Sequence, residues 1–420
     1  MVSAVKQVVI VGGGVVGAAC AHHLVRAGLR VTVVEKDRFG AACSHANCGL
    51  ISPSHVLPLA EPGVLGLGLS AMFAANAPLM IKPRWSWDLW QWLVQFGLRC
   101  NHQDMIESAI AIQALLNSSR GLYEQMLESE GFDCDWQKRG GLFVYRTRGA
   151  FEKFGEVNRL LTEVLDAGHR RIEPDELAVM EPALKPGLAG AWFYEQDAHL
   201  RPDRLMANWK EKLRGAGVEI LEQCEFRGFI ARNERVAAVQ TSRGEFAADH
   251  VVVAAGALTP FLQEHLGCKV PIQPGKGYSL TMSRPRICPT HPLLFPEHRV
   301  AVTPWQSGYR LGSIMELAGY DATLHPERLE LLRGGARDYL HEPYCEPVVE
   351  KWFGWRPLTW DSRPIIDRTP LYENCLIAAG HNMLGLSMAP ATGKLAMELI
   401  TGRQPHINPR PYRLARFQTI

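Results

Sequence analysis

A glycine-rich turn near the N-terminus constrains this chain more than any other stretch. Residues 8–11 are Val-Val-Ile-Val, which predicts a buried strand, and the pattern Gly12-x-Gly14-x-x-Gly17 predicts a tight turn into a helix. The first glycine permits the bend, the second lets a pyrophosphate approach bare backbone, and the third lets the helix pack on the strand. Because a helix N-terminus also offers amide donors, the turn predicts a dinucleotide site.

A second predicted strand, residues 30–34, ends at an acidic residue. Glu35 follows the last glycine of the turn by 18 residues, close to the usual spacing of about 20 in such sites. A carboxylate there can accept hydrogen bonds from both hydroxyls of an adenosine ribose, and it repels a 2′-phosphate. A glycine turn with a purely structural role would not require this acid.

Composition narrows the class of protein. The 420 residues exceed one typical core, so we expect two intertwined domains, and a net charge of +2 gives no reason to expect a nucleic-acid partner. The ten cysteines are scattered without C-x-x-C pairs, which favours a reducing compartment and predicts no metal site. The chain enters its first predicted strand within a few residues and shows no secretory pattern, so we expect a cytoplasmic location.

A loop after the second strand carries a family resemblance. Residues 43–53 are small and polar, and they contain the pattern Ser-x-x-Asn-x-Gly-x-Ile-Ser-Pro. With the glycine turn and Glu35, this pattern resembles the D-amino acid oxidase superfamily of flavoproteins, and most closely the bacterial D-amino acid and D-hydroxyproline dehydrogenases. The resemblance implies a mixed α/β fold: a Rossmann-type FAD-binding domain and a discontinuous substrate domain built on an antiparallel sheet.

The resemblance implies that the chain passes several times between these domains. The FAD-binding domain is expected to comprise residues 1–60, 197–265 and 351–420. Residues 61–196 are expected to form most of a cap with a helical insert, and residues 266–350 a substrate-binding sheet.

FAD contacts follow from matching positions, and we expect FAD to be bound without a covalent link. Some relatives attach the flavin to a histidine three residues before the loop glycine, but here that position is Ala46 and the histidine is His45. The predicted strand at residues 250–257 ends in small residues that allow close approach of the cofactor, and no second full GxGxxG predicts an NAD site. The expected FAD contacts are Gly12, Gly14, Val15, Val16, Gly17, Glu35, Lys36, Ser44, Ala46, Asn47, Gly49, Leu50, Ala255, Gly256, Gly380, Met383, Leu384, Gly385, Leu386 and Ser387.

Three residues are the catalytic candidates. Arg356 lies in a Gly-x-Arg-Pro turn that resembles the element carrying the substrate-carboxylate arginine in D-amino acid and glycine oxidases, and arginine is the side chain that binds a carboxylate at two points. Tyr278, on a predicted strand, could contact the same carboxylate or could equally be a core residue. His381 lies in the glycine turn before the last helix, close to Met383, which stands where glycine oxidases carry an arginine.

Residues 62–100 leave two interpretations open. They are rich in glycine and contain Trp85, Trp87, Trp90 and Trp92, but glycine, asparagine and proline interrupt the apolar run too often for a transmembrane helix. A buried helical segment under the substrate domain would explain these residues. A shallow membrane patch that reaches a quinone would explain them too, because tryptophan favours membrane interfaces.

The resemblance therefore predicts an FAD enzyme that oxidises the Cα–N bond of a D-amino acid by hydride transfer to flavin N5. D-proline and cis-4-hydroxy-D-proline are candidate substrates, and a quinone or another acceptor would take the electrons. Two alternatives stay open: a glycine- or sarcosine-type amine oxidase that uses oxygen, and a flavin-bearing subunit without activity. The sequence does not predict an oligomeric state.

Overall fold

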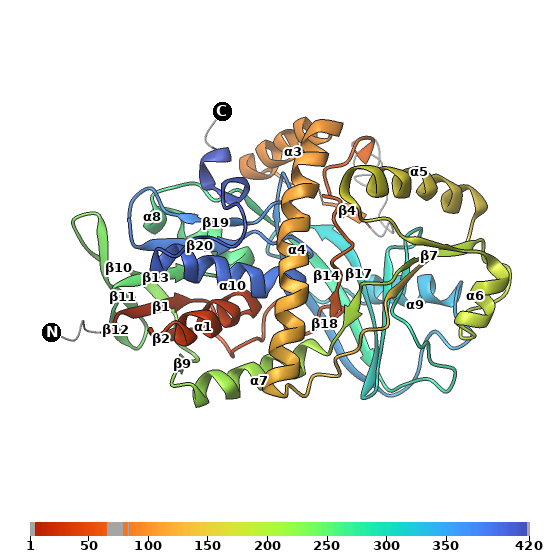
Figure 1. Ribbon diagram of the computed structural model, residues 1–420, viewed down its shortest axis with the longest axis horizontal. Coiled ribbons are helices and arrows are strands. Elements are labelled where there is room, and N and C mark those ends of the chain that lie inside the picture. Colours follow the sequence, from red (N-terminus) through yellow and green to blue (C-terminus); the bar gives the residue numbers. More distant parts are fainter. Residues whose placement is uncertain (1–4, 65–78, 83, 418–420) are drawn as a thin grey trace.

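A six-stranded sheet forms one half of the molecule in the computed structural model, which describes residues 5–64, 79–82 and 84–417 (Figure 1). Its strand order is β19–β20–β13–β1–β2–β9. Five strands run parallel and β19 runs antiparallel to β20. Their bounds are β1 (Gln7–Val11), β2 (Arg30–Val34), β9 (Glu219–Leu221), β13 (His250–Val253), β19 (Ile365–Arg368) and β20 (Cys375–Ala379). The central apolar runs are buried, as expected for a sheet covered on both faces.

Helices pack closely on one face of this sheet. Helix α1 (Val15–Arg26) lies against α10 (Gly385–Thr401), and a Cβ at Gly393 would come within 2.4 Å of the Ala19 carbonyl oxygen. The long helix α4 (His102–Glu130) crosses α10 (Figure 1), and the Tyr123 hydroxyl donates a 2.8 Å hydrogen bond to the Leu386 carbonyl oxygen. The insert between β4 and β5 therefore helps to cover the first domain.

A nine-stranded, mostly antiparallel sheet forms the other half, in the order β18–β14–β17–β16–β15–β5–β7–β6 with β4 beside β17. Its strands are β4 (Leu79–Ile81), β5 (Gly141–Tyr145), β6 (Arg170–Ile172), β7 (Gly190–Tyr194), β14 (Ile272–Met282), β15 (Leu293–Phe295), β16 (Val300–Trp305), β17 (Gly308–Leu317) and β18 (Val348–Thr359). The predicted mixed α/β fold, with a Rossmann-type sheet and an antiparallel sheet, is confirmed. The expected boundary between the substrate-binding sheet (266–350) and the last part of the FAD-binding domain (351–420) falls inside strand β18. That strand pairs with β14 of the second sheet on both sides of the boundary.

The remaining elements are peripheral or short. The helices are α3 (Trp87–Arg99), α5 (Arg148–Leu165), α6 (Pro174–Met180), α7 (Pro202–Gly215), α8 (Gln263–Leu266) and α9 (Pro326–Arg337), with 3-10 turns η1 (Gly256–Leu262), η2 (Arg410–Tyr412) and η3 (Leu414–Phe417). Strands β10 (Phe226–Arg232), β11 (Arg235–Thr241) and β12 (Gly244–Ala247) form a small sheet, and β3 (Leu50–Ile51) pairs with β8 (Ala198–His199).

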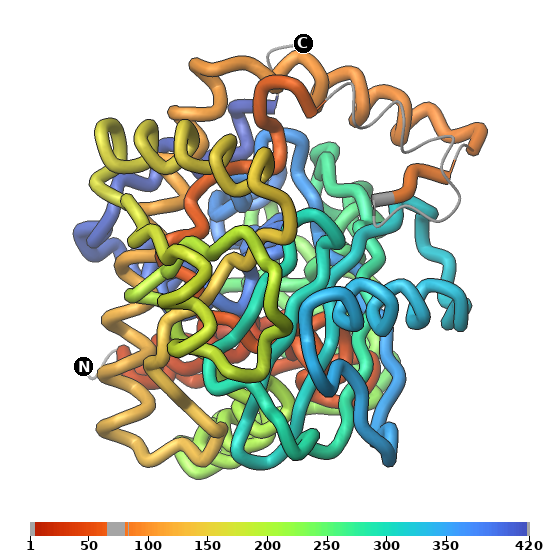
Figure 2. Tube along the Cα trace, turned by 90° about the vertical axis from the view of Figure 1, so that its right-hand side faces the viewer, coloured from red at the N-terminus to blue at the C-terminus, as the bar shows by residue number. Residues whose placement is uncertain are grey.

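Helix α3 bears on the two interpretations of residues 62–100. Residues 65–78 and 83 of this stretch lie outside the described part of the chain. The helix lies at the edge of the molecule (Figure 2), and only one side of it is buried, through Leu89, Trp92 and Gln95. Trp85 is 104% exposed and Trp87 is 79% exposed. The expected helix is present and its buried side packs against strands of the second sheet, but its other side is exposed, so the interpretation as a buried helical segment holds only in part for the described residues. Among the described helices, none is long and apolar enough to cross a membrane.

Candidate cofactor and substrate site

The glycine turn lies at the carboxyl end of the six-stranded sheet, where open α/β sheets bind their ligands. Gly12 has a φ of +113°, and a Cβ there would lie 2.5 Å from the Ala254 carbonyl oxygen. A Cβ at Gly17 would lie 2.0 Å from the Gly12 carbonyl oxygen. Both positions therefore require glycine, one for the bend and one for the close packing of α1.

The space beside Gly14 is open by comparison. A Cβ at Gly14 would meet the Ser44 hydroxyl at 3.4 Å, an ordinary contact. That hydroxyl accepts a 2.9 Å hydrogen bond from the Val15 amide at the N-terminus of α1. Bare backbone, helix N-terminal amides and a hydroxyl meet here, which is the donor set that a pyrophosphate requires. Val16, in the same helical turn, is half-buried.

Glu35 follows β2 and reaches back to the glycine turn. Its carboxylate accepts hydrogen bonds of 2.7 Å from the Gly13 amide and 2.9 Å from the Asp37 amide. Burial raises the pKa of Glu35, and the two amide hydrogen bonds oppose that rise. The side chain remains partly accessible, so its oxygens can accept further hydrogen bonds from a ribose. Lys36, beside it, is exposed.

Small residues from two further segments border the same end of the sheet. Ala255 and Gly256 follow β13, and both are partly accessible. Gly256 has a φ of +55°, and among the described residues no atom lies within 4 Å of where its Cβ would be. The chain therefore leaves room for a ligand along this edge.

The turn between β20 and α10 presents its own accessible residues. Gly380 has a φ of +79°, and a Cβ there would lie 2.7 Å from a methyl carbon of Thr359. Met383 is 37% exposed, and Leu384 and Gly385 are partly accessible where α10 begins. Of the predicted FAD contacts in this turn, Met383, Leu384 and Gly385 are accessible, whereas Gly380 is buried.

Ser387 connects α10 to the loop at residues 43–53. Its hydroxyl donates a 3.1 Å hydrogen bond to the Leu50 carbonyl oxygen and accepts a 3.2 Å hydrogen bond from the Ser52 amide. Ser387 and its neighbour Leu386 are buried. The structure therefore brings the glycine turn, the loop and the start of α10 together, as the sequence predicts.

His381 is buried and hydrogen-bonded to α10. Its Nε2 lies 2.9 Å from the Thr392 hydroxyl within that helix. Burial lowers the pKa of His381 to about 3, so the ring is neutral at physiological pH. The structure gives the ring a packing position behind α10 and does not bring it to Arg356.

The loop at residues 43–49 owes its shape to Asn47 and Gly49. The Asn47 side chain donates to the carbonyl oxygens of Cys43 (3.4 Å) and Ser44 (3.2 Å), and its Oδ1 accepts a 2.8 Å hydrogen bond from the Gly49 amide. Gly49 has a φ of +72°, and a Cβ there would lie 2.1 Å from the Leu200 carbonyl oxygen. These contacts explain why an asparagine and a glycine occupy this pattern.

Arg356 projects from β18 into the interior between the two sheets. Its Nη1 donates a 2.8 Å hydrogen bond to the Ile314 carbonyl oxygen, and its Nη2 a 3.3 Å hydrogen bond to that of Ser313. Burial lowers the pKa of the Arg356 guanidinium, and the residue as a whole is still partly accessible. The thiols of Cys43 and Cys48 in the loop act on the pKa of Arg356 in the opposite direction to burial.

Two unusual backbone features accommodate this arginine. A Cβ at Gly277 on β14 would lie 2.4 Å from the guanidinium carbon of Arg356, so a larger residue there requires the arginine side chain to shift. Ser313 and Ile314, whose carbonyl groups accept its hydrogen bonds, have positive φ values of 99° and 39°. Strain of this kind persists where the surrounding structure demands it, commonly at functional sites.

Tyr278 lies on the opposite face of the same sheet. It directly follows Gly277, and successive residues of a strand point to opposite faces. The Tyr278 hydroxyl donates a 2.7 Å hydrogen bond to Glu316, in the core beside α9. The structure therefore places Tyr278 as a core residue, the second of the two sequence interpretations, and does not bring it to Arg356.

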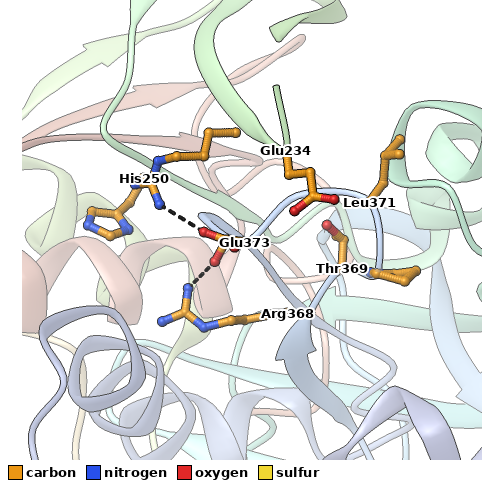
Figure 3. Close-up of a pocket in the computed structure, with 8 residues that line it drawn as sticks. Glu234, His250, Arg368, Thr369, Leu371 and Glu373 are labelled. Carbon is orange, nitrogen blue, oxygen red and sulfur yellow. Dashed lines mark hydrogen bonds and ion pairs between the residues drawn. The ribbon is translucent and has the colours of Figure 1, made fainter. Parts of the chain in front are cut away.

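A hollow elsewhere on the molecule is unrelated to this crevice. Figure 3 shows it at the amino end of the six-stranded sheet, beside His250, with Arg235 and Arg368 contacting Glu373. It lies across the sheet from the glycine turn. Among residues 5–64, 79–82 and 84–417, no group of three or more histidine, cysteine or acidic side chains is placed to hold a metal ion.

The site combines a Rossmann-type crevice at the end of one sheet with a partly buried arginine on a second sheet that faces it. This is the arrangement of a flavin-dependent oxidoreductase. The chain belongs to the DAO family of FAD dependent oxidoreductases, because residues 7–399 match the model of that family. It is 31% identical to D-amino acid dehydrogenase of Granulibacter bethesdensis, covering 98% of this chain and 99% of that protein. It is 33% identical to D-amino acid dehydrogenase of Paramagnetospirillum magneticum, over the same shares.

Solved structures support the fold. Glycine oxidase from Geobacillus kaustophilus superposes with a TM-score of 0.77 at 22% identity, covering 98% of this chain and 99% of that one. L-proline dehydrogenase from P. horikoshii has a TM-score of 0.73 at 22% identity, covering 99% and 98%. The cofactor is FAD, and the open backbone at Gly14, the acceptor at Glu35 and the accessible turn before α10 fit it.

Two residues of the second sheet that shape the site were not identified from the sequence, one beneath Arg356 and one that binds the loop at residues 43–49. Gly277 and Arg310 were not among the predicted site residues, although Gly275 and Gly277 recur at the period of a strand. Two glycines on one face of a strand are a signal that something approaches that face closely.

Proposed function

We propose that the protein oxidises the Cα–N bond of D-amino acids, with D-proline and cis-4-hydroxy-D-proline as candidate substrates. The observation that carries the proposal is Arg356. Two of its five N–H groups donate to backbone carbonyls, and within the described part of the chain the other three have no acceptor. A planar cation that is partly buried and has donors to spare suits the carboxylate of a small amino acid.

The protein's contribution would be orientation. When bound, FAD supplies the acceptor for the hydride that leaves Cα. Arg356 would hold the substrate carboxylate, and the loop at residues 43–49 would limit where the rest of the substrate can lie. His381 is neutral and bonded to Thr392, so the residues offer no protonated histidine at this point, and a substrate with a neutral amine needs no further base.

A panel of D- and L-amino acids, glycine and sarcosine tests the proposal, with an artificial electron acceptor and with oxygen measured in parallel. D-amino acids should reduce the dye and should bleach the yellow protein under argon. Faster turnover of glycine or sarcosine with oxygen would instead support the amine oxidase alternative. A bound flavin that no amine bleaches would support a subunit without activity.

We propose further that FAD is held without a covalent bond. Ala46 offers no nucleophile at the position where some relatives use histidine. Acid precipitation should release all the flavin, and its mass should be that of FAD. Glu35→Arg should lose most of its flavin, because the substitution removes the ribose acceptor and puts a cation in its place. Flavin that stays in the pellet would contradict the proposal.

Helix α3 supports a membrane contact on the inner face of the cytoplasmic membrane, from which electrons would pass to a quinone. Trp87, Trp90, Val94 and Leu98 recur at helical spacing and are 79%, 39%, 60% and 64% exposed. Exposed tryptophans beside the exposed Lys82 suit an anionic membrane surface.

Cosedimentation with anionic vesicles tests this contact. Trp85→Ser combined with Trp87→Ser should weaken vesicle binding by about tenfold or more, because two large apolar side chains no longer enter the interface. Val179→Ser, at an apolar residue of α6 that is 82% exposed, is the matched control and should bind as the unmodified protein does. Equal binding of both variants, or turnover with oxygen as fast as with dyes, would contradict the proposal.

A further inference from the structure

Three side chains of the nine-stranded sheet donate hydrogen bonds to three consecutive backbone carbonyls of the loop at residues 43–49, and together these contacts form what we call the grip. The Ser279 hydroxyl donates a 2.8 Å hydrogen bond to the Ala46 carbonyl oxygen. Arg310 Nη1 donates to that of Asn47 at 2.7 Å, and the Thr303 hydroxyl to that of Cys48 at 2.6 Å. The donors come from β14, β17 and β16, which are neighbours in that order, so the loop crosses the sheet one residue per strand.

Arg310 is the charged member of this grip and is itself held on several sides. It is 1% exposed, its Nε donates a 2.9 Å hydrogen bond to the Thr281 hydroxyl, and its guanidinium lies 4.6 Å from the centroid of the Trp305 ring. Burial lowers the pKa of Arg310 to about 10, so it stays charged at physiological pH. A buried cation with such neighbours has little freedom to move.

One carboxylate links the same arginine to the loop a second time. Glu350 Oε2 lies 3.8 Å from Arg310 Nη2, while Glu350 Oε1 lies 2.7 Å from Nε2 of His45. The loop is therefore held at the Asn47 backbone and at the His45 side chain by one charge pair on the sheet. Ser44, the residue before His45, accepts a hydrogen bond from the Val15 amide at the N-terminus of α1.

The grip determines which way the loop's amides point. In a trans peptide the carbonyl and the following N–H point in opposite directions. Because the carbonyls of Ala46 and Asn47 face the sheet, the N–H groups of Asn47 and Cys48 face away from it, toward the side of the FAD-binding domain. Of these two residues, Asn47 is one for which the sequence resemblance implies flavin contact, and Cys48 is its neighbour.

We propose that Arg310 is a positioning residue for the flavin: through the Asn47 carbonyl it sets the orientation of the loop amides that meet the cofactor. Its influence on the reaction is indirect. The proposal rests on FAD binding in this crevice and not on which amine is oxidised.

Arg310→Met tests the proposal on the purified holoenzyme, with Arg310→Lys as the conservative variant. Loss of a charged hydrogen bond should weaken FAD binding about 10- to 100-fold, shift the visible absorption maxima and change the midpoint potential of the flavin. Arg310→Lys should restore part of each property. Arg328→Met is the matched control: Arg328 is 3% exposed and lies on α9 at the opposite face of the same sheet. It should lower the melting temperature and leave the flavin spectrum and potential unchanged.

The proposal is overturned if Arg310→Met lowers the melting temperature as Arg328→Met does while FAD affinity, spectrum and potential stay at their original values. Should Arg310→Met not fold, Thr303→Val removes only the donor to the Cys48 carbonyl and should shift the same spectrum and potential to a smaller degree. An unchanged spectrum in Thr303→Val would then count against the grip. An enzyme that binds FAD normally but oxidises no D-amino acid would refute the proposed function and would not affect this test.

Discussion

The two faces of the nine-stranded sheet differ although they are built from the same strands. The face toward the FAD-binding domain carries Gly277 and Gly312, with Arg356 lying over the first and the thiol of Cys48 near the second. The face toward α9 carries Tyr278 and Lys276 in a dense polar network. The first face, the bare face, has no side chain beneath Arg356 at Gly277 and leaves that arginine with donors to spare, while its polar residues Ser279, Thr303 and Arg310 hold the loop at residues 43–49. The other, the filled face, packs its charged side chains among partners.

The filled face shows what a structural charge looks like in this protein. Lys276 lies 3.6 Å from Asp321 and 4.7 Å from the centroid of the Phe353 ring, and the Tyr278 hydroxyl bonds to Glu316. The charges there have partners from the protein itself. Arg356 is bonded only to backbone carbonyls, so its charge has no ionic partner among the described residues. The contrast supports the proposal that Arg356 pairs with the carboxylate of a substrate.

Removing the arginine of the bare face should have the largest effect. Arg356→Ala leaves the substrate carboxylate desolvated without its partner, which costs on the order of 3–5 kcal/mol, or roughly two to four decades in kcat/KM for D-amino acids. Arg356→Lys should recover only part, because an ammonium cannot make the two-point contact. Steady-state kinetics measure both, and an unchanged flavin content shows that the fold is intact. Near-normal kcat/KM in Arg356→Ala would mean that the carboxylate is held elsewhere.

Filling the bare face should have the next largest effect. In Gly277→Ala the new Cβ would lie 2.4 Å from the guanidinium carbon of Arg356, so the side chain must shift. A displacement of about 1 Å can cost roughly 100-fold in rate, and we expect kcat/KM to fall by about 10- to 100-fold. Gly334→Ala in α9 is the control, because no described atom lies within 4 Å of that Cβ. Equal kinetics in the two variants would show that Arg356 does not need this space.

A change on the filled face should affect stability and spare catalysis. Tyr278→Phe leaves the buried Glu316 carboxylate without one hydrogen-bond donor, which should lower the free energy of unfolding by about 1–3 kcal/mol. Urea unfolding measures the loss, and kcat/KM per bound flavin should stay within about twofold of the original. A large fall in kcat/KM instead would place Tyr278 in the substrate site after all.

Local motifs made most of the site predictable. Short sequence patterns determine the geometry of three parts of the site, because the residues of each part are contiguous or close in sequence. These parts are the turn from Gly12 to Gly17, Glu35 after the second strand, and the loop at Asn47. Arg356 was predicted because its Gly-x-Arg-Pro motif is also contiguous, although the expected turn is wrong: the motif lies within strand β18, in continuous pairing with β14. These motifs define a fold of two sheets with the crevice at the carboxyl end of the first, as the structure has it.

The contacts that span the chain were not predictable. Arg310 and Asn47 are 263 residues apart in the sequence, so their hydrogen bond depends on the register of three strands. Tyr278 and Gly277 are neighbours, and only that register decides which of them faces the arginine. The exposed tryptophans of α3 posed a similar problem, because spacing alone does not tell which side of a helix the rest of the protein covers.

The order in which the six-stranded sheet is assembled has a consequence for biosynthesis. Its central strand β1 pairs with β2 and β13, but β20 comes from Cys375–Ala379 and α10, which covers α1, from Gly385–Thr401. During translation, the edge of β13 that pairs with β20 and the side of α1 that packs on α10 stay uncovered until almost the whole chain has been made. Such long-range pairing slows folding and leaves apolar surface and an unpaired strand edge exposed to aggregation. Truncation before β20 should therefore yield an insoluble chain, and nascent chains should depend on chaperones until the last 50 or so residues emerge.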